Sequence, residues 1–464
     1  MKSQLLIGAV HSGSGKTMLT LGLLRAFKNR GLSVQSFKSG PDYIDTKFHE
    51  LASGNKTINL DLFLSSESHI RNIYEKYASS SDISITEGVM GLFDGYDKMQ
   101  GSSAQIAETL DIPVVMVINA KSMAYSVAPL MYGFKNFSKN INVVGVIFNM
   151  VSSESHYTFL KEACEDVGLE PLGYLPKNKE LEIPSRHLGL NMDKEFLLNE
   201  FADKTASFVE KYIDLDRLLI LTQKPVPMAD FGGSIGTVDS DSNLFTENVN
   251  VIKDAPDSLS ASEGGVNGCT RTPLLKSAVA LDEAFNFMYH ENIEYLKNRG
   301  AVTFFSPLND SELPDADFVY LPGGYPELHL KELCHNTKMY ESIRNYVEQG
   351  GRLLAECGGM MYLSSSITGE DGVEYPMVNI FSQKASMQNM KLTLGYRQFE
   401  YKGLKMKGHE FHYSSIESEL KSVAKQYSAK NKPVDTKLLR YRNAIVGYTH
   451  LYWAEIDDFM GLFG

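Results

Sequence analysis

A cysteine that directly follows an apolar run is the residue of this sequence best placed to act as a nucleophile. In LLAECGGMMYL, Cys357 ends a run typical of a buried strand, and Gly358 and Gly359 open a helical pattern. A cysteine on such a sharp turn lies near a helix N-terminus, which favours the thiolate, and the turn has the mechanics of a nucleophile elbow. A lone buried cysteine is usually a small core residue, but the Glu-Cys-Gly-Gly context favours a catalytic thiol.

A thiol nucleophile needs a base and donors for an oxyanion. His450 in VGYTHLYW is the preferred base, and His409 and His412 in KGHEFHYSS are the alternatives. The alternative for each histidine is a structural role within its strand. Gly323 and Gly324 in FVYLPGGYPELHL carry backbone N–H groups suited to an oxyanion hole.

A glycine-rich loop of the phosphate-binding type opens the chain. In IGAVHSGSGKT, an apolar stretch leads through Gly13 and Gly15 to Lys16 and Thr17, and the helical pattern MLTLGLLRAF follows. Small residues let successive backbone N–H groups point at phosphate oxygens. We expect Lys16 to reach the β- and γ-phosphates of ATP and the Thr17 hydroxyl to hold Mg²⁺. Val10 stands where the strict pattern has glycine, but the context still favours this function over a plain helix-capping turn.

Carboxylates for a metal ion are expected beside this loop, because Mg²⁺ takes oxygen ligands. FKSGPDYIDTKFHE carries Lys38, Asp42 and Asp45, and ITEGVMGLFDG carries Glu87 and Asp94. Asp42 and Glu87 are the predicted metal ligands, since both come at the ends of predicted strands. For Asp45 and Asp94 a metal site and a capping or solvated position are equal alternatives.

Parallel sheets must position both groups of residues. Apolar runs rich in Val and Ile alternate with segments long enough for helices, at 4–10, 33–37, 83–86, 114–119 and 143–149. This rhythm predicts an α/β fold with helices on both faces of the sheet and ligands at the carboxyl ends of its strands. A second α/β rhythm begins near Ser277 and ends in a β-rich tail.

Length and texture divide the chain into two domains. We expect an ATP-binding domain at 1–220, a linker or partly disordered insertion at 221–275, and a thiol-bearing domain at 276–464. The net charge of −12 argues against a nucleic-acid partner. No apolar run approaches the ~20 residues that span a bilayer, so no membrane is expected. Four cysteines in 464 residues form no disulfide framework, which favours a cytoplasmic protein.

Seven blocks of the sequence, in order, resemble the cobyrinic acid a,c-diamide synthases of corrinoid biosynthesis. The blocks are the phosphate loop, KSGPDYIDTKFH, EGVMGLFDG, IPSRHLGL, DEAFNFMYHEN, PGGYPELH and AECGGMMYL. The resemblance runs from about residue 4 to 453 and weakens only in the predicted linker. It implies a P-loop, dethiobiotin-synthetase-like ATPase domain fused to a class I, triad-type glutamine amidotransferase domain of flavodoxin-like fold.

The resemblance also implies an activity, that of a glutamine-hydrolysing carbon–nitrogen ligase. The second domain would hydrolyse L-glutamine through a cysteinyl thioester. The first would use ATP and Mg²⁺ to convert the a- and c-side-chain carboxylates of a corrin, or a related tetrapyrrole, into acyl phosphates that ammonia attacks. A passage for ammonia between the domains is then expected. Which tetrapyrrole is the substrate stays open, and so does the oligomeric state, with a homodimer as one alternative.

Roles for single residues follow from the same resemblance. Cys357 would be the nucleophile, His450 its base and Gly323–Gly324 the oxyanion region. Lys16, Thr17, Asp42 and Glu87 would serve nucleotide and metal, and Lys38 would neutralise charge in phosphoryl transfer. Asn149 either faces the nucleobase or makes a structural side-chain bond. Three positions depart from common patterns: Ala9 and Val10 in the loop, Asn119 where Asp is usual, and Tyr452 where many triad amidotransferases carry Glu.

A different class of function fits part of the sequence. A phosphate-loop switch or partitioning ATPase, with a non-catalytic glutaminase-like binding module, would act through nucleotide-dependent partner binding. Such a module has no need of a reactive thiol. Glutamine hydrolysis that Cys357→Ala abolishes separates the two hypotheses.

Overall fold

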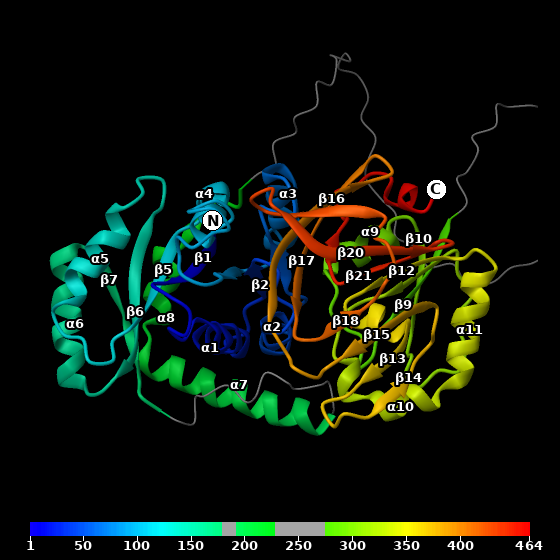
Figure 1. The fold of residues 1–464 in the computed structure, drawn as a ribbon. Helices are drawn as coiled ribbons and strands as arrows, with labels where there is room; N and C mark the ends of the chain where they lie inside the picture. The colour runs from blue at the N-terminus through cyan, green and yellow to red at the C-terminus, as the bar shows by residue number, and fades with distance from the viewer. Residues whose placement is uncertain (179–191, 228–273) are drawn as a thin grey trace, which may run out of the picture.

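A computed structural model describes residues 1–178, 192–227 and 274–464 of the chain. The described residues form two α/β domains, drawn in blue to green and in yellow-green to red in Figure 1. The block IPSRHLGL and nearly all of the predicted linker lie outside the described residues. Within the described ranges no helix is both long enough and apolar enough to cross a membrane.

The first domain is built on one sheet with the order β3-β2-β4-β1-β5-β6-β7, and all of these strands run parallel. Its strands are β1 (Lys2–Ala9), β2 (Val34–Ser39), β3 (Ile58–Leu60), β4 (Ile83–Glu87), β5 (Val114–Asn119), β6 (Val143–Val151) and β7 (Glu170–Pro176). A short strand, β8 (Gln223–Lys224), pairs antiparallel with β1. The first sheet therefore gains a strand just beyond residue 220.

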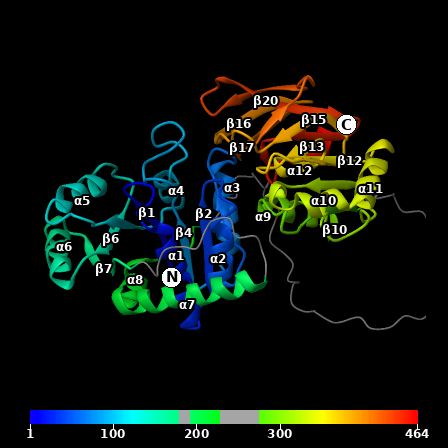
Figure 2. The ribbon, with the colours of Figure 1, turned by 60° about the horizontal axis from the view of Figure 1, so that its bottom comes forward.

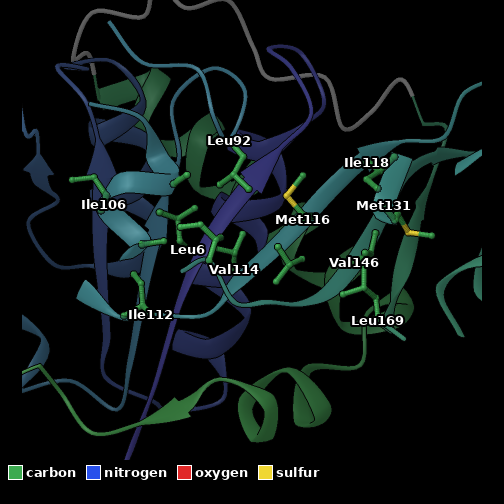
Figure 3. Packing of buried hydrophobic residues seen from close by; sticks show 14 of the residues in the cluster. Leu6, Leu92, Ile106, Ile112, Val114, Met116, Ile118, Met131, Val146 and Leu169 are labelled. Carbon is green, nitrogen blue, oxygen red and sulfur yellow. The ribbon is translucent and has the colours of Figure 1, made fainter. Parts of the chain in front are cut away.

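Helices cover both faces of this sheet because its strands are apolar on both sides. One face carries α1 (Lys16–Asn29), α2 (Asp45–Ser53), α7 (Met192–Tyr212) and α8 (Leu215–Leu221). The other carries α3 (Glu67–Ala78), α4 (Ser103–Leu110), α5 (Val127–Asn136) and α6 (Glu154–Val167). Leu5 and Leu6 of β1 are both fully buried, one in each core. Figure 3 shows the core around Leu6, Val114 and Met116.

The second domain has a ten-stranded mixed sheet with the order β10-β9-β11-β12-β21-β20-β19-β16-β17-β22. Its parallel half consists of β9 (Leu275–Ala280), β10 (Gly300–Phe305), β11 (Phe318–Leu321), β12 (Arg352–Glu356) and β21 (Ala444–Gly447). The antiparallel half consists of β16 (Thr393–Tyr401), β17 (Leu404–His412), β19 (Ala424–Ser428), β20 (Pro433–Tyr441) and β22 (His450–Tyr452).

Shorter elements complete the second domain. A four-stranded sheet contains β13 (Ser364–Thr368), β14 (Glu374–Pro376), β15 (Phe381–Ser386) and β18 (Ser415–Glu417). It shares a core with α10 (Leu330–His335), α11 (Thr337–Glu348) and α12 (Gly358–Tyr362). The opposite core contains α9 (His290–Lys297) and the 3₁₀ helix η3 (Phe459–Leu462), and η2 (Pro326–Leu328) follows β11.

The five strands expected in the first domain are confirmed, with their ends shifted by two residues or fewer. Three further strands of this sheet, β3, β7 and the two-residue β8, were not predicted. β3 has three residues, and β7 contains a proline near each end, so neither shows a long apolar run. The predicted α/β fold with two domains is confirmed (Figures 1 and 2).

Candidate active sites

The phosphate loop joins β1 to α1 and needs glycine for its conformation. Gly13 and Gly15 have φ angles of 78° and 99°, in the left-handed region that glycine adopts without strain. A Cβ on Gly15 would lie 2.1 Å from the Asn149 side chain. Asn149 in turn donates to the Ser14 carbonyl oxygen at 3.0 Å. The structural side-chain bond considered for Asn149 is thus present, and its contact with a nucleobase stays a prediction.

Lys16 and Thr17 begin α1 beside the ends of β2 and β4. The Lys16 ammonium donates to the Met90 carbonyl oxygen at 2.5 Å, and burial lowers the pKa of Lys16. The Thr17 hydroxyl lies 2.7 Å from Glu87 Oε1 and 3.2 Å from Asp45 Oδ2. The loop, a hydroxyl and two carboxylates therefore meet at the carboxyl edge of the sheet, as ligand sites do in this architecture.

Lys38 lies at the centre of the carboxylates. Its ammonium is 2.8 Å from Asp45 Oδ2 and 3.0 Å from Glu87 Oε1, and it is 2% exposed. Burial alone would lower the pKa of Lys38, but Glu87 and Asp45 outweigh it and raise that pKa. Burial alone would likewise raise the pKa of Glu87, but Lys38 and His49 hold it well below its usual range. Both groups are therefore charged at neutral pH.

Asp42 and Asp94 each use a carboxylate oxygen to hold a turn of the backbone. Asp42 uses Oδ1 to accept from the backbone N–H groups of Ile44 and Asp45, both at 2.9 Å, so it shapes the turn into α2. Asp94 similarly accepts from the Gly91 N–H at 3.0 Å. The structure thus brings Asp45, rather than Asp42, to the Thr17 hydroxyl. The sequence favoured Asp42 because it comes nearer the strand end, and it gave no sign of which of the two carboxylates turns toward Thr17.

These donors fit Mg²⁺, which is bound in proteins by one or two carboxylates, with waters and substrate phosphates completing its shell. Thr17, Glu87 and Asp45 supply oxygen atoms at one point. In the described ranges there is no cluster of three or more His, Cys, Asp or Glu arranged to hold a metal alone. Two carboxylates and one hydroxyl leave coordination positions for phosphate oxygens, which suits an ion that arrives with a nucleotide.

The thiol lies where β12 turns into α12, in a backbone conformation rare for a residue with a side chain. Cys357 has φ 48° and ψ −107°, and its N–H donates to the Gly447 carbonyl oxygen at 2.8 Å. Non-glycine residues in such regions cost on the order of 1–3 kcal/mol and concentrate at functional sites. Burial raises the pKa of Cys357, so the resting group is a thiol and not the thiolate expected from the turn alone. Attack by this sulfur needs a base.

Gly323 and Gly324 lie between the thiol turn and His450. A Cβ on Gly323 would come 2.2 Å from His450 Cε1, and one on Gly358 would come 3.1 Å from Gly324 N. The Gly323 carbonyl accepts from the N–H groups of Asn286 and Phe287, both at 3.0 Å. Because a trans peptide sets N–H opposite C=O, the Gly324 N–H points away from Asn286 and Phe287. The predicted nucleophile, oxyanion region and base are thus neighbours.

His450 is the imidazole that packs on this glycine pair, and it is 1% exposed. The ring of His409 stacks on it at 5.0 Å, but His409 Nδ1 is paired with the Tyr289 hydroxyl at 2.8 Å. His412 pairs with the Ser414 carbonyl at 2.9 Å and stacks on Tyr448. Of the three predicted histidines, His450 is therefore the one next to the oxyanion region.

A buried glutamate lies beside His450, although the sequence offered none at the usual place. Glu356 Oε2 is 4.0 Å from His450 Nδ1, and both residues are 1% exposed. Glu356 accepts from the Tyr320 hydroxyl at 2.7 Å and from the Leu451 N–H at 2.9 Å. Sequence reasoning missed this residue because it looked for an acid after His450, whereas Glu356 immediately precedes Cys357.

An aromatic cluster connects the two sites across the domain boundary. Tyr43 directly follows Asp42 in the first domain and is 8% exposed. Its ring lies 5.3 Å from that of His450, 5.5 Å from Phe287 and 5.0 Å from Tyr289, all in the second domain. No pattern in the sequence indicated this contact.

A cavity of about 950 Å³ opens beside this cluster. It is lined by residues of α2 and of the segment between β9 and α9, so both domains contribute to its wall. Lys47, Asn286 and Phe287 are among them, and so is Tyr325 from the segment after β11. Its size is within the range of small-molecule sites in proteins.

Known families match both halves of the chain. Residues 5–190 match the CobQ/CobB/MinD/ParA nucleotide binding domain, and residues 276–457 match the CobB/CobQ-like glutamine amidotransferase domain. The first match contains the phosphate loop and Glu87, and the second contains Cys357 and His450. The two candidate sites thus coincide with the two matched domains.

Similar proteins extend over nearly the whole chain. A cobyrinate a,c-diamide synthase of Caldanaerobacter subterraneus subsp. tengcongensis is 40% identical, covering 89% of this chain and 86% of the relative. Those of Listeria monocytogenes and Saccharolobus solfataricus are 37% and 34% identical, covering 90% and 98% of this chain and 88% and 98% of the relatives. Such identity over both domains, and over nearly the full length of each relative, shows that the chain belongs to the cobyrinate a,c-diamide synthase family.

Proposed function

We propose that this protein converts side-chain carboxylates of cobyrinate, or of a closely related tetrapyrrole, into amides with ATP and L-glutamine. The observation that carries the proposal is the contact of two different chemistries at one boundary. The loop between β2 and α2, which borders the phosphate site, places Tyr43 5.3 Å from His450, the candidate base of the thiol site. The relatives' name, cobyrinate a,c-diamide synthase, supplies the substrate class.

In the first domain a substrate carboxylate oxygen attacks the γ-phosphorus of ATP, and ADP leaves, so that an acyl phosphate forms. Lys16 and Lys38 offset the negative charge that gathers on the phosphoryl oxygens. The Thr17 hydroxyl with Glu87 and Asp45 would hold Mg²⁺, which neutralises phosphate charge when bound. Phosphorylation is needed because a free carboxylate has no adequate leaving group for attack by ammonia.

In the second domain the Cys357 sulfur attacks the side-chain amide carbon of glutamine while His450 takes the thiol proton. The Gly324 N–H is the group we assign as a hydrogen-bond donor to the oxyanion of the tetrahedral intermediate. The intermediate collapses to a thioester, and ammonia leaves with the proton that His450 returns. Water then hydrolyses the thioester, which yields glutamate and restores the thiol.

The acyl phosphate and the ammonia must meet before either reacts with water. The cavity at the boundary is the place we assign to the tetrapyrrole side chain, since residues next to both sites line it. Ammonia attacks the acyl carbon there and phosphate leaves, giving the amide. A cytoplasmic location fits this chemistry, since ATP is abundant there and thiols stay reduced.

The test is amide formation on a panel of tetrapyrrole acids, followed by mass spectrometry, with either glutamine or ammonium chloride as the nitrogen source. Cys357→Ala should abolish synthesis from glutamine and keep synthesis from ammonium. Lys16→Ala should abolish both and keep some glutamine hydrolysis, because the two chemistries lie in different domains. A wild-type protein that hydrolyses no glutamine would instead support the nucleotide-switch hypothesis.

A further inference from the structure

The buried imidazole of His450 has an unmet requirement on one side. To take the thiol proton at Nε2, the ring must carry its own hydrogen on Nδ1. In the part of the chain that the structure describes, Nδ1 of His450 is buried and has no hydrogen-bond partner. A buried N–H without an acceptor has lost its hydrogen bond to water and gained none in return, so the productive tautomer is disfavoured unless an acceptor approaches.

Glu356 is placed to be that acceptor. Its Oε2 lies 4.0 Å from His450 Nδ1. This distance is longer than a hydrogen bond, and a small rotation of either side chain would close the gap. The carboxyl group is held by the Tyr320 hydroxyl at 2.7 Å and the Leu451 N–H at 2.9 Å. Glu356 also ends β12 directly before the nucleophile, so the backbone fixes it relative to the thiol turn.

The acid position used by many triad amidotransferases is engaged elsewhere in this chain. Tyr452 stands two residues after His450, and its hydroxyl pairs with His69 Nε2 of the first domain at 2.8 Å. An acceptor for the His450 Nδ1–H therefore comes from a different strand, as Glu356 of β12 does.

The charges of the two groups support each other. Burial raises the pKa of Glu356 to about 8, and burial with nearby His412 lowers the pKa of His450 to about 3. Each group alone resists ionisation in this dry site. An imidazolium formed during the reaction beside an ionised carboxylate is favoured, because opposite charges a few ångströms apart stabilise each other most in a low-dielectric interior.

We propose that Glu356 is the positioning residue of the thiol site: it accepts the Nδ1–H of His450 and stabilises the imidazolium formed when His450 takes the Cys357 proton. The proposal rests on the glutaminase chemistry proposed above. It assigns the third member of a nucleophile–base–acid arrangement to the residue that precedes the nucleophile. Mutation of an equivalent orienting acid in other enzymes lowers kcat by about 10⁴-fold.

The first experiment measures glutamine hydrolysis by Glu356→Gln. We expect kcat to fall by roughly 10²–10⁴-fold, with the KM for glutamine changed less than about twofold because Glu356 touches no substrate atom. Synthesis from ammonium chloride, which does not use the thiol site, should stay near the wild-type rate. That last measurement reports an intact fold and separates a positioning role from a structural one.

The second readout is the pH profile of kcat. Glu356 stabilises the imidazolium by its charge only when it is ionised, so the wild-type kcat should rise with pH through a midpoint near 8, its raised pKa. Other ionisable groups lie nearby. Glu327 raises the pKa of the Cys357 thiol, and His412 lowers the pKa of His450. The rings of His409 and Tyr43 pack against His450. Only the rise that disappears in Glu356→Gln belongs to Glu356.

Two further variants complete the test. Tyr320→Phe removes a hydrogen bond that lowers the pKa of Glu356, so the midpoint should move to higher pH. This variant also decides the matter if Glu356→Gln does not fold. Tyr452→Phe, at the usual acid position, should leave kcat and the profile unchanged. The proposal is overturned if Glu356→Gln keeps kcat within twofold, if it loses ammonium-dependent synthesis equally, or if Tyr320→Phe leaves the profile unmoved. A wild type without glutaminase activity would instead refute the proposed function.

Discussion

Lys47 brings a positive charge to the cavity between the domains without a carboxylate to pair with it among the described residues. Its ammonium contacts the Asn286 side chain and lies 5.0 Å above the Phe287 ring, and burial lowers its pKa to about 8. Two other lysines of the cavity wall are paired, Lys56 with Glu50 and Lys297 with Glu294, each at 2.9 Å. A buried ammonium that has lost its water and has no carboxylate partner is stabilised when an anionic ligand binds next to it.

We therefore expect Lys47→Met to weaken binding of the tetrapyrrole acid specifically. A charged hydrogen bond contributes about 1.5–3 kcal/mol, so the KM for the tetrapyrrole should rise by roughly 10- to 100-fold while the KM values for ATP and glutamine stay within twofold. Steady-state kinetics with each substrate varied in turn measures this. Lys56→Met, which removes a paired lysine from the same wall, is the control. A parallel rise in all three KM values would assign Lys47 to structure.

Among single residues, the sequence indicated the positions of those that belong to local motifs. The turns that carry Cys357, Lys16 and Thr17 were predictable because glycines lie beside these residues. Glu356 and Tyr43 were not, because their partners are distant along the chain and their roles arise from contacts across strands or domains. Asp42 and Asp45 show a third case, in which the motif was found but the backbone, through the Asx-type turn of Asp42, decided which carboxylate faces Thr17.

The turn after β11 shows how an element positions chemistry through the absence of side chains. Gly323 and Gly324 let the backbone pass between the thiol turn and His450, and a Cβ on Gly324 would lie 2.0 Å from the Ala284 carbonyl oxygen. The strained Cys357 and the small residues around it thus form one packed unit. Strands β9, β11 and β12 are parallel and end at the same edge of the sheet, so they hold this packed unit in place.

Gly323→Ala should abolish glutamine hydrolysis while leaving synthesis from ammonium chloride. The added methyl group would meet His450 Cε1 at 2.2 Å, so the ring must leave its place beside the thiol turn. Gly133→Ala is a matched control: it lies exposed on α5, and its added Cβ meets nothing within 4 Å. Alanine should stabilise that helix by up to about 1 kcal/mol. Normal glutaminase activity of Gly323→Ala would show that His450 is not held by this glycine.

The secondary structure was predictable wherever strands are long and rich in branched residues, as β1, β5 and β6 are. β3 and β7 were not predicted because each lies at an end of the first sheet, where a strand needs fewer apolar residues. Likewise, the second sheet's antiparallel half reads in the sequence only as a β-rich tail, although it carries His450 and His409 into the site.

On the scale of the whole molecule, the two domains meet through a polar rim around aromatic side chains. The rim includes the Ser66 N–H on Glu455 at 2.9 Å and an ion pair of Lys430 with Asp97 at 3.1 Å, whereas the Tyr396 hydroxyl donates to the buried Asp61 Oδ2 at 2.7 Å. Tyr43, Phe63, Leu64, Tyr289 and Tyr452 form the buried centre. This buried centre keeps bulk water out of the contact between the two domains.

Tyr43 directly follows Asp42 in the first domain and packs on His450 in the second, so its ring should govern how much ammonia reaches the acyl phosphate. In Tyr43→Leu the ring contacts with His450, Phe287 and Tyr289 are lost. The ratio of glutamate formed to amide formed should then rise above the wild-type value, because ammonia escapes and water enters. Tyr43→Phe keeps the ring and should keep the ratio. Measuring both products from the same reaction gives the ratio directly, and an unchanged ratio in Tyr43→Leu would mean that ammonia travels by a route that this ring does not border.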